Sequence, residues 1–211
     1  MRMHVFDMDG TLMEGTACLE ISKAVGALEE TLAIEADWVG GEINDVGFWN
    51  LCLPLWEGIT PAQIDQAFSD SPWLRGVSKV LGDIKQRDEI SVVISQSPEW
   101  FVERICRWGL DHAFGAGVTP GDRTGSARLV TSADKVSITN RLLSSTGISA
   151  ANCIAYGDSS SDLELFKHLD NTVAINAKPH IRTLASAAYD GDDLFAAYKL
   201  GRELMDAAAV N

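Results

Sequence analysis

Short apolar runs alternate with amphipathic segments along most of this chain. Four apolar runs that end in a polar residue predict inner parallel strands at Met3–Asp7, Ile90–Ser95, Cys153–Asp158 and Thr172–Asn176. Apolar residues at helical spacing predict helices at Glu99–Trp108, Asp134–Ser145 and Ser160–Leu169. Strands that alternate with helices of this length are typical of an α/β fold with a doubly wound parallel sheet. The turn-rich stretch Gly117–Val130 predicts a small hairpin-like excursion.

The region between the first two predicted strands breaks this alternation. It predicts helices and no convincing strand, with candidates at Thr16–Ala27, Glu29–Gly40, Asp45–Leu53 and Thr60–Ser69. The last candidate begins with a capping threonine followed by proline at the first helical position. Because 211 residues suffice for one domain with a modest insertion, we expect a Rossmann-like core of residues 1–14 and 76–211. Residues 15–75 would form an inserted helical subdomain.

Composition and charge narrow the class of protein. Hydrophobic residues make up 46% of the chain and charged residues 22%, which is typical of globular proteins and excludes wholesale disorder and fibrous classes. The formal charge of −13 disfavours binding to nucleic acid or to anionic membrane surfaces. No apolar run is long enough to predict a membrane-spanning helix. The sequence leaves the oligomeric state open.

The cysteines and the first residues bear on the cellular compartment. Cys18, Cys52, Cys106 and Cys153 form no CxxC pair, which argues against a zinc knuckle or a thioredoxin-type site. Their mostly apolar neighbours predict buried free thiols in a reducing compartment. A carboxylate at Asp7 comes too early for a secretory signal, so we expect a cytoplasmic protein.

Carboxylates gather at the ends of the predicted strands. Asp7 and Asp9 follow the first strand, Ser95 ends the second, and Asp158 and Asp162 follow the third. One such aspartate is commonly a turn or capping residue, but four at two strand ends are harder to explain in this way. Ligands of open parallel sheets bind at the carboxyl ends of the strands. Clustered carboxylates there predict a hard cation with oxygen ligands, Mg²⁺ above all.

The same residues resemble the four motifs of the haloacid dehalogenase superfamily. Asp7-Met8-Asp9-Gly10-Thr11-Leu12 is similar to the first motif, DxDGT, and follows an apolar strand as that motif does. Ser95 matches the second motif, Lys135 at the head of a helix the third, and Gly157-Asp158-Ser159-Ser160-Ser161-Asp162 the fourth, GDxxxD. The motifs span nearly the whole chain, and the helical insert resembles the cap of the phosphoserine phosphatase branch.

This resemblance implies phosphoryl transfer through an aspartyl-phosphate. Asp7 would be the nucleophile, and Asp9 the general acid and base. Mg²⁺ would be held by the Asp7 carboxylate, the Asp9 backbone carbonyl and Asp158, with Asp162 as a ligand or as support. The phosphoryl oxygens would be bound by Ser95, Gln96, Lys135, Gly10 and Thr11. Without the resemblance, Lys135 would be read as a solvated surface residue and Ser95 as a strand-end hydroxyl that satisfies nearby backbone.

Asp9 also separates the activities within the superfamily. Dehalogenases, which attack carbon, lack an aspartate at this position, so the resemblance implies a phosphatase that acts on small-molecule phosphomonoesters. A phosphomutase shares both aspartates and is the alternative enzyme. A non-catalytic binding domain on the same fold is the alternative from another class.

The predicted cap departs from the phosphoserine phosphatase pattern. Thr16 stands where those enzymes have a glutamate for the substrate amine, and Glu20 lies nearby but out of register. No arginine lies between Arg2 and Arg75 to meet a substrate carboxylate, so strict selectivity for phosphoserine is not expected. The cap aromatics are either its hydrophobic core or rings that receive a neutral, apolar or cationic organic part. The candidate substrate contacts are Thr16, Glu20, Phe48, Trp49 and Trp56.

Overall fold

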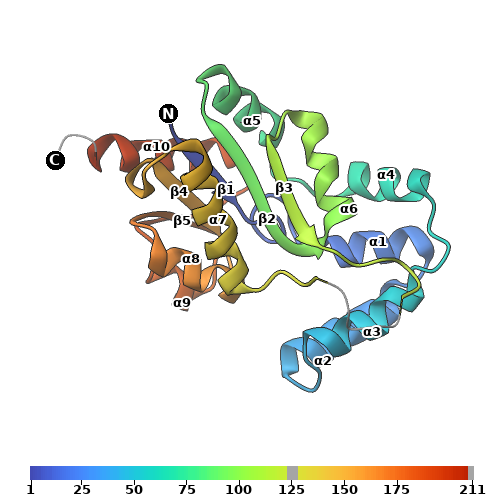
Figure 1. The fold of residues 1–211 in the computed structure, drawn as a ribbon. Coiled ribbons are helices and arrows are strands. Elements are labelled where there is room, and N and C mark those ends of the chain that lie inside the picture. Colours follow the sequence, from blue (N-terminus) through green and yellow to red (C-terminus); the bar gives the residue numbers. More distant parts are fainter. Residues whose placement is uncertain (123–127, 209–211) are drawn as a thin grey trace.

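Six parallel strands form one sheet in the computed structural model, which describes residues 1–122 and 128–208 (Figure 1). The strand order is β3-β2-β1-β4-β5-β6, and every neighbouring pair is parallel. The strands are β1 (Met3–Phe6), β2 (Ile90–Pro98), β3 (His112–Ala116), β4 (Cys153–Gly157), β5 (Asn171–Ile175) and β6 (Ala187–Tyr189). The doubly wound α/β core is confirmed, and its four predicted strands are β1, β2, β4 and β5.

Sequence reasoning missed the two edge strands. β6 has only three residues, and none of them is fully buried, so it makes no apolar run. β3 reads His-Ala-Phe-Gly-Ala, and its first three residues are only partly buried. A Cβ atom on Gly115 would lie 2.5 Å from the Cα of Glu99. Close approach of a neighbouring segment therefore requires glycine there, and it hides the strand from a propensity argument.

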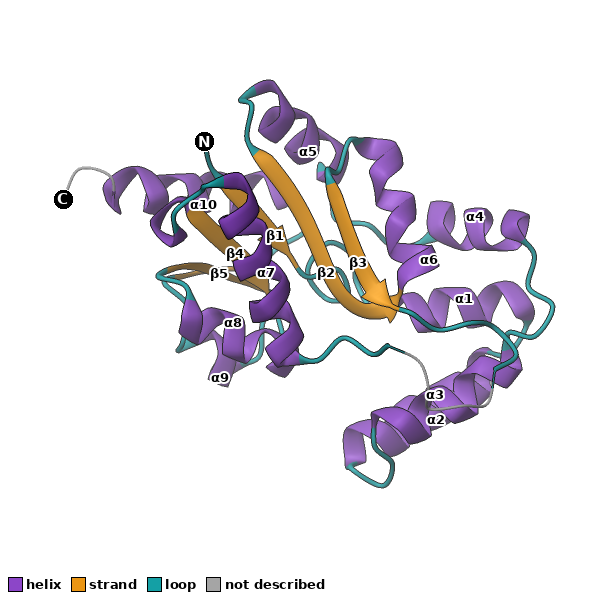
Figure 2. Cartoon of the chain, in the orientation of Figure 1, coloured by secondary structure: helices purple, strands orange, loops and turns teal. Residues whose placement is uncertain are grey.

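Helices cover both faces of the sheet (Figure 2). Successive side chains of β1 point to opposite faces, and the buried apolar side chains on each face need a covering layer. Val5 packs on the face covered by α7 (Ser132–Thr146), α8 (Leu163–His168) and α9 (Pro179–Arg182). Phe6 packs on the opposite face with α5 (Val77–Gln86), α6 (Glu99–Val102) and α10 (Leu194–Ala208). Among the described residues, no helix is long and apolar enough to span a membrane.

Two predicted helices are divided. The helix expected at Glu99–Trp108 begins as α6 and continues as a 3₁₀ helix, Glu103–Trp108. The helix expected at Ser160–Leu169 begins as a 3₁₀ turn, Ser160–Asp162, before α8. A further 3₁₀ turn, Ala150–Asn152, precedes β4. The apolar spacing predicted both helical segments. It could not show that one segment ends, and the other begins, in 3₁₀ rather than α geometry, because the two geometries differ little over so few residues.

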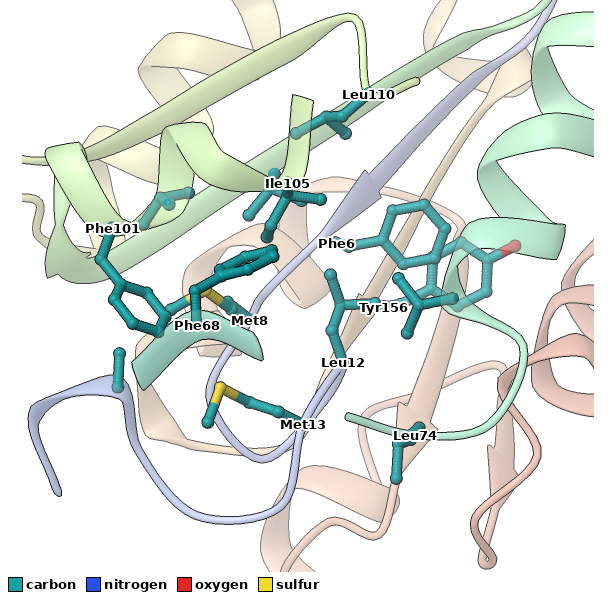
Figure 3. Packing of buried hydrophobic residues seen from close by; sticks show 14 of the residues in the cluster. Phe6, Met8, Leu12, Met13, Phe68, Leu74, Phe101, Ile105, Leu110 and Tyr156 are labelled. Carbon is teal, nitrogen blue, oxygen red and sulfur yellow. The ribbon is translucent and has the colours of Figure 1, made fainter. Parts of the chain in front are cut away.

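Four helices precede α5 in the segment between β1 and β2. They are α1 (Ala17–Val25), α2 (Leu28–Gly40), α3 (Asp45–Leu55) and α4 (Pro61–Asp70). Thr60 forms a capping box with Gln63 and places Pro61 at the start of α4. α2 and α3 pair with each other and stand apart from the sheet (Figure 1). α4 packs on the core through Phe68, whose ring centroid lies 5.7 Å from that of Phe101 (Figure 3).

The four cysteines differ in their exposure to solvent. Cys18, Cys52 and Cys153 are buried free thiols, whereas Cys106 is exposed, so the expectation of burial was wrong for Cys106. It lies in the 3₁₀ helix that turns its neighbour Ile105 into the core instead. Gly117 pairs with Arg128 in an antiparallel bridge, as the hairpin-like excursion would require. Residues 123–127 of the predicted excursion lie outside the described residues.

Candidate active site

Asp7 stands at the carboxyl end of the central strand. β1 lies between β2 and β4, where the chain winds outward in both directions, and open α/β sheets bind their ligands at this point. The Asp7 side chain is only 6% exposed. Its Oδ1 accepts a 2.8 Å hydrogen bond from the Met8 backbone, and its Oδ2 accepts one of 3.4 Å from the Ser161 hydroxyl. Asp7 is therefore held at the floor of the site in a fixed orientation.

Lys135 is buried beside Asp7. Thr131 and Asp134 form a capping box that begins α7 and brings Lys135 into its first turn. The Lys135 ammonium lies 3.0 Å from Asp7 Oδ1 and 2.7 Å from Asp162 Oδ1, and only 1% of its side chain is exposed. Burial alone would lower the pKa of Lys135, but Asp162 and Asp7 outweigh burial and raise this pKa. The lysine is thus a fixed positive charge at the floor.

Asp158 and Asp162 lie in the loop that follows β4. Asp162 is fully engaged: Oδ1 accepts from Lys135, and Oδ2 accepts from the backbone N–H groups of Asp158 and Ser159 at 3.1 and 3.3 Å. Thr11 donates a 3.4 Å hydrogen bond to Asp158 Oδ1. A Cβ atom on Gly157 would lie 2.3 Å from Asp162 Cγ, so only glycine permits this approach. Asp162 holds the loop, and Asp158 remains on the cavity side.

Asp9 is held by three hydrogen bonds from two segments, the start of α1 and β2. Its Oδ1 accepts from the Ala17 backbone at the start of α1, at 2.7 Å. Its Oδ2 accepts from the hydroxyls of Ser97 and Ser95, at 2.5 and 3.4 Å. Burial raises the pKa of Asp9, although these hydrogen bonds oppose the shift. Sequence reasoning missed Ser97, because β2 extends past Ser95 and a serine in a strand gives no signal of its own.

The carboxylates exceed the positive charge at the floor, which fits a bound cation. Asp7, Asp158 and Asp162 each place one oxygen within 4.8 Å of the other two. Burial and the charge of Asp162 raise the pKa of Asp158 to about 7, and the same two causes raise that of Asp7. A Cβ atom on Gly10, whose φ is +74°, would lie 2.3 Å from Asp158 Oδ2. Oxygen donors crowded onto a glycine suit a hard divalent cation such as Mg²⁺.

Asp7, Asp9, Gly10 and Asp158 form the floor of a cavity of about 820 Å³. The predicted site residues that line it are Asp7, Asp9, Gly10, Thr16, Phe48, Trp49, Gln96 and Asp158. Four further predicted residues are buried behind this surface, where they contact the aspartates that line it: Ser95, Thr11, Lys135 and Asp162. Gln96 donates its side-chain amide to the Val130 carbonyl at 3.0 Å, which fixes this residue against the segment that leads into α7.

Two of the predicted substrate contacts lie away from the cavity surface. Glu20 is buried on α1 and forms a 2.5 Å ion pair with Lys23. Trp56 is fully buried, and its indole N–H donates to the Ser22 hydroxyl at 2.8 Å. Both side chains find their partners within the helical insert, so the structure does not place them against a ligand.

The cavity wall contains residues that sequence reasoning passed over. Glu35 and Trp38 of α2 and Asp45 at the start of α3 line it. The Thr16 hydroxyl donates a 2.6 Å hydrogen bond to Glu35 Oε1. The i, i+3 spacing of Glu35 and Trp38 puts them on one face of a helix, but that spacing alone does not show which way the face turns.

Comparisons with known proteins agree with this geometry. The family model for haloacid dehalogenase-like hydrolases matches residues 4–167. The chain is 26% identical over 198 residues to the phosphoserine phosphatase of Archaeoglobus fulgidus, covering 92% of this chain and 58% of that protein. It is 24% identical over 198 residues to that of Methanocaldococcus jannaschii, covering 92% of this chain and 94% of that protein.

Solved structures share the fold. A substrate-bound phosphoserine phosphatase superposes with a TM-score of 0.79 at 24% identity, covering 94% of this chain and 97% of that one. A family hydrolase from Salmonella enterica serovar Typhi gives a TM-score of 0.80 at 24% identity, covering 92% and 69%. With the family match over most of its length and the four motifs gathered at one end of the sheet, the chain belongs to the haloacid dehalogenase-like hydrolases.

Proposed function

We propose that this protein is a Mg²⁺-dependent phosphatase of small-molecule phosphomonoesters that works through an aspartyl-phosphate. One observation carries the proposal: Asp7 lies at the end of the central strand, on the floor of an open cavity, and 3.0 Å from a buried lysine. A carboxylate in this position can attack phosphorus, because phosphoryl transfer needs mainly positioning and neutralisation of charge.

The two aspartates of the first motif have separate roles. An Asp7 oxygen forms a bond to phosphorus as the bond from phosphorus to the leaving oxygen breaks. Asp9 gives its proton to that leaving oxygen, and the alcohol departs. Water then attacks the aspartyl-phosphate and gives a proton to Asp9, which releases phosphate and restores Asp7. The raised pKa of Asp9 favours the protonated form that the first step requires.

The remaining charged groups neutralise the phosphoryl oxygens. Lys135 supplies a fixed positive charge next to Asp7, and Ser95 and the backbone of Gln96 lie in the carboxyl-terminal half of the neighbouring strand β2. Mg²⁺ would be held by Asp7, Asp158 and the Asp9 carbonyl, with Asp162 supporting the loop, and when bound it supplies positive charge to the phosphoryl group. Gly10 and Thr11 shape the turn against Asp158.

The proposal extends to selectivity and compartment. The named relatives support a phosphomonoester substrate, whereas Thr16 in the cavity wall argues against strict selectivity for phosphoserine. The free thiols at all four cysteines support a reducing compartment, the cytoplasm.

An assay of p-nitrophenyl phosphate with Mg²⁺ and with a chelator tests the reaction. We expect nitrophenolate and inorganic phosphate to form together in Mg²⁺, and the rate to fall at least about 100-fold when the cation is removed. Addition of Mg²⁺ after chelation should restore the rate. A non-catalytic domain would give no release in either buffer. A phosphomutase would return the phosphoryl group of a natural ester to the same carbon skeleton, which phosphorus NMR would detect as an isomer without free phosphate.

A further inference from the structure

Glu35 is a carboxylate in the cavity wall, and it has no positive partner among the described residues. It is partly buried, and the Thr16 hydroxyl holds its Oε1 at 2.6 Å. In the part of the chain that the structure describes, no lysine or arginine forms an ion pair with Glu35, whereas Glu20 is matched by Lys23 at 2.5 Å. Burial raises the pKa of Glu35, and Asp9 adds to this shift. A cation on a bound ligand would offset both contributions to the raised pKa of Glu35, because a nearby opposite charge favours the ionised carboxylate.

Three aromatic rings, those of Trp38, Phe48 and Trp49, line the same cavity as this carboxylate. The ring centroids of Trp38 and Phe48 are 5.3 Å apart, and those of Phe48 and Trp49 are also 5.3 Å apart. The Trp38 indole donates a 2.8 Å hydrogen bond to Asp45, which fixes this ring and brings a second carboxylate to the wall. Aromatic faces attract ammonium groups, and more strongly where the cation is removed from water.

Nothing among the described residues of this wall suits an anion. Lys178 is the one lysine or arginine among the described residues that line the cavity. It is exposed and belongs to the loop between β5 and α9, on the side of Asp158 rather than of the helical insert. Glu35, Asp45 and the rings would therefore repel a carboxylate on the organic part of a substrate.

The start of α1 connects this wall to the reacting groups. Thr16, the N-cap residue, holds Glu35, and the next residue, Ala17, donates its backbone N–H to Asp9. Two consecutive residues thus position both the carboxylate of the wall and the proposed general acid. An ester whose leaving oxygen meets Asp9 would direct its organic part past Thr16.

We propose that the substrate is a phosphomonoester whose organic part carries an amine or quaternary ammonium group and no carboxylate, with Glu35 and the rings of Trp38, Phe48 and Trp49 as the cation subsite. The proposal rests on the phosphatase function above and specifies its substrate class. It assigns the phosphate to the floor of the cavity and the cation to the wall.

A kinetic comparison of matched esters tests the subsite. Phosphocholine and 3,3-dimethylbutyl phosphate have the same shape and differ in the charge of one central atom. Phosphoethanolamine and phosphoserine differ by one carboxylate. We expect kcat/KM to be at least tenfold higher for phosphocholine than for its neutral isostere, and for phosphoethanolamine than for phosphoserine. Equal values within the first pair, or a preference for phosphoserine, would overturn the proposal.

The Glu35→Gln variant assigns the preference to this residue. It should lower kcat/KM for phosphocholine at least tenfold and leave that for the neutral isostere within threefold. The matched control is Glu30→Gln, an exposed glutamate on the same helix that does not line the cavity, and it should change neither value. Unchanged charge selectivity in Glu35→Gln would assign the preference elsewhere and contradict the subsite.

Binding without turnover separates this proposal from the phosphatase function. In the Asp7→Asn variant, titration of the two isosteric esters can be followed by tryptophan fluorescence, since Trp38 and Trp49 line the wall. Phosphocholine should bind at least tenfold more tightly than the neutral ester, and Glu35→Gln should abolish the difference. If wild-type protein hydrolyses no ester, the phosphatase function fails, but these dissociation constants still decide the subsite, and equal constants refute it.

Discussion

Buried charges gather at both ends of the sheet, and the two groups are built in opposite ways. At the amino end, Glu89 accepts from Arg202 at 2.6 Å and lies 3.0 Å from His4 Nε2. At the carboxyl end, the carboxylates of Asp7, Asp158 and Asp162 surround Lys135. Burial alone would raise the pKa of Glu89, but hydrogen bonds from His4 and Arg202 lower this pKa to about 2. The pKa of Asp158 is instead raised to about 7.

The difference lies in the balance of charge. Glu89 and Arg202 neutralise one another, and the hydroxyl of Tyr156, 3.2 Å from His4 Nδ1, satisfies the imidazole. Burial lowers the pKa of His4, so at neutral pH Arg202 supplies the positive charge of this group. Three carboxylates share one ammonium at the other end, beside a cavity. A balanced group is complete within the fold, whereas an unbalanced one is completed by a ligand.

The largest expected effect follows from Asp7→Asn at the unbalanced end. The substitution keeps the size of the side chain and removes the nucleophile, so kcat should fall on the order of 10³-fold or more. The midpoint of thermal unfolding should stay the same or rise, because a carboxamide is easier to bury than one of three crowded carboxylates. Steady-state phosphate release and calorimetry measure the two quantities. Residual activity near that of wild type would refute the assigned nucleophile, and strong destabilisation would refute the claim of excess charge.

Lys135→Met should affect both activity and stability. The substitution leaves Asp7 and Asp162 buried without their cation. Removal of one partner of a buried ion pair typically lowers the unfolding free energy by about 3–5 kcal/mol, and we expect a loss of this size. Loss of the fixed charge at the phosphoryl group should lower kcat about 10²- to 10³-fold. The matched control is Lys167→Met, an exposed lysine on α8. Urea unfolding and steady-state kinetics of both variants measure the effects, and equal stability of the two would contradict the buried role of Lys135.

The residues at the unbalanced end could be anticipated from sequence because chemistry and topology coincide there. Asp7, Ser95 and Asp158 each follow or end an apolar run in the sequence, and parallel strands bring the carboxyl ends of such runs together without further information. Lys135 needed the family motif, since a lysine in the first turn of a helix is ordinarily solvated.

Contacts between helices were beyond the same reasoning. Glu35 meets Thr16 only because α2 folds back on α1, 19 residues later in the chain. Glu89 and Arg202 are 113 positions apart, and neither lies at the carboxyl end of a strand or in a motif. Periodicity shows which face of a helix is apolar, but it does not show which neighbouring element that face contacts. The contact depends on how the whole insert packs, or on how α10 packs on the sheet. The cation subsite and the amino-end group therefore required the structure.

The smallest expected effect belongs to the balanced end and concerns pH. The pKa of Glu89 is lowered from its ordinary value of 4.5 to about 2 in the folded protein. A carboxylate with a depressed folded pKa contributes stability above its unfolded pKa, and this contribution is lost as pH falls from about 4.5 to about 2. The contribution should be about 1–3 kcal/mol at neutral pH.

Urea unfolding of wild type and Glu89→Gln between pH 7 and pH 3, with a chelator present, measures this contribution. The difference in unfolding free energy between the two proteins should be largest at pH 7 and shrink toward pH 3. Phosphate release in Mg²⁺ at pH 7 and 25 °C should be unchanged, because Glu89 and its partners do not line the cavity. A stability difference that is constant with pH would show that Glu89 acts through packing alone. A loss of activity in the folded variant would show that the two ends of the sheet are coupled. It would contradict the view that the amino-end group serves stability alone.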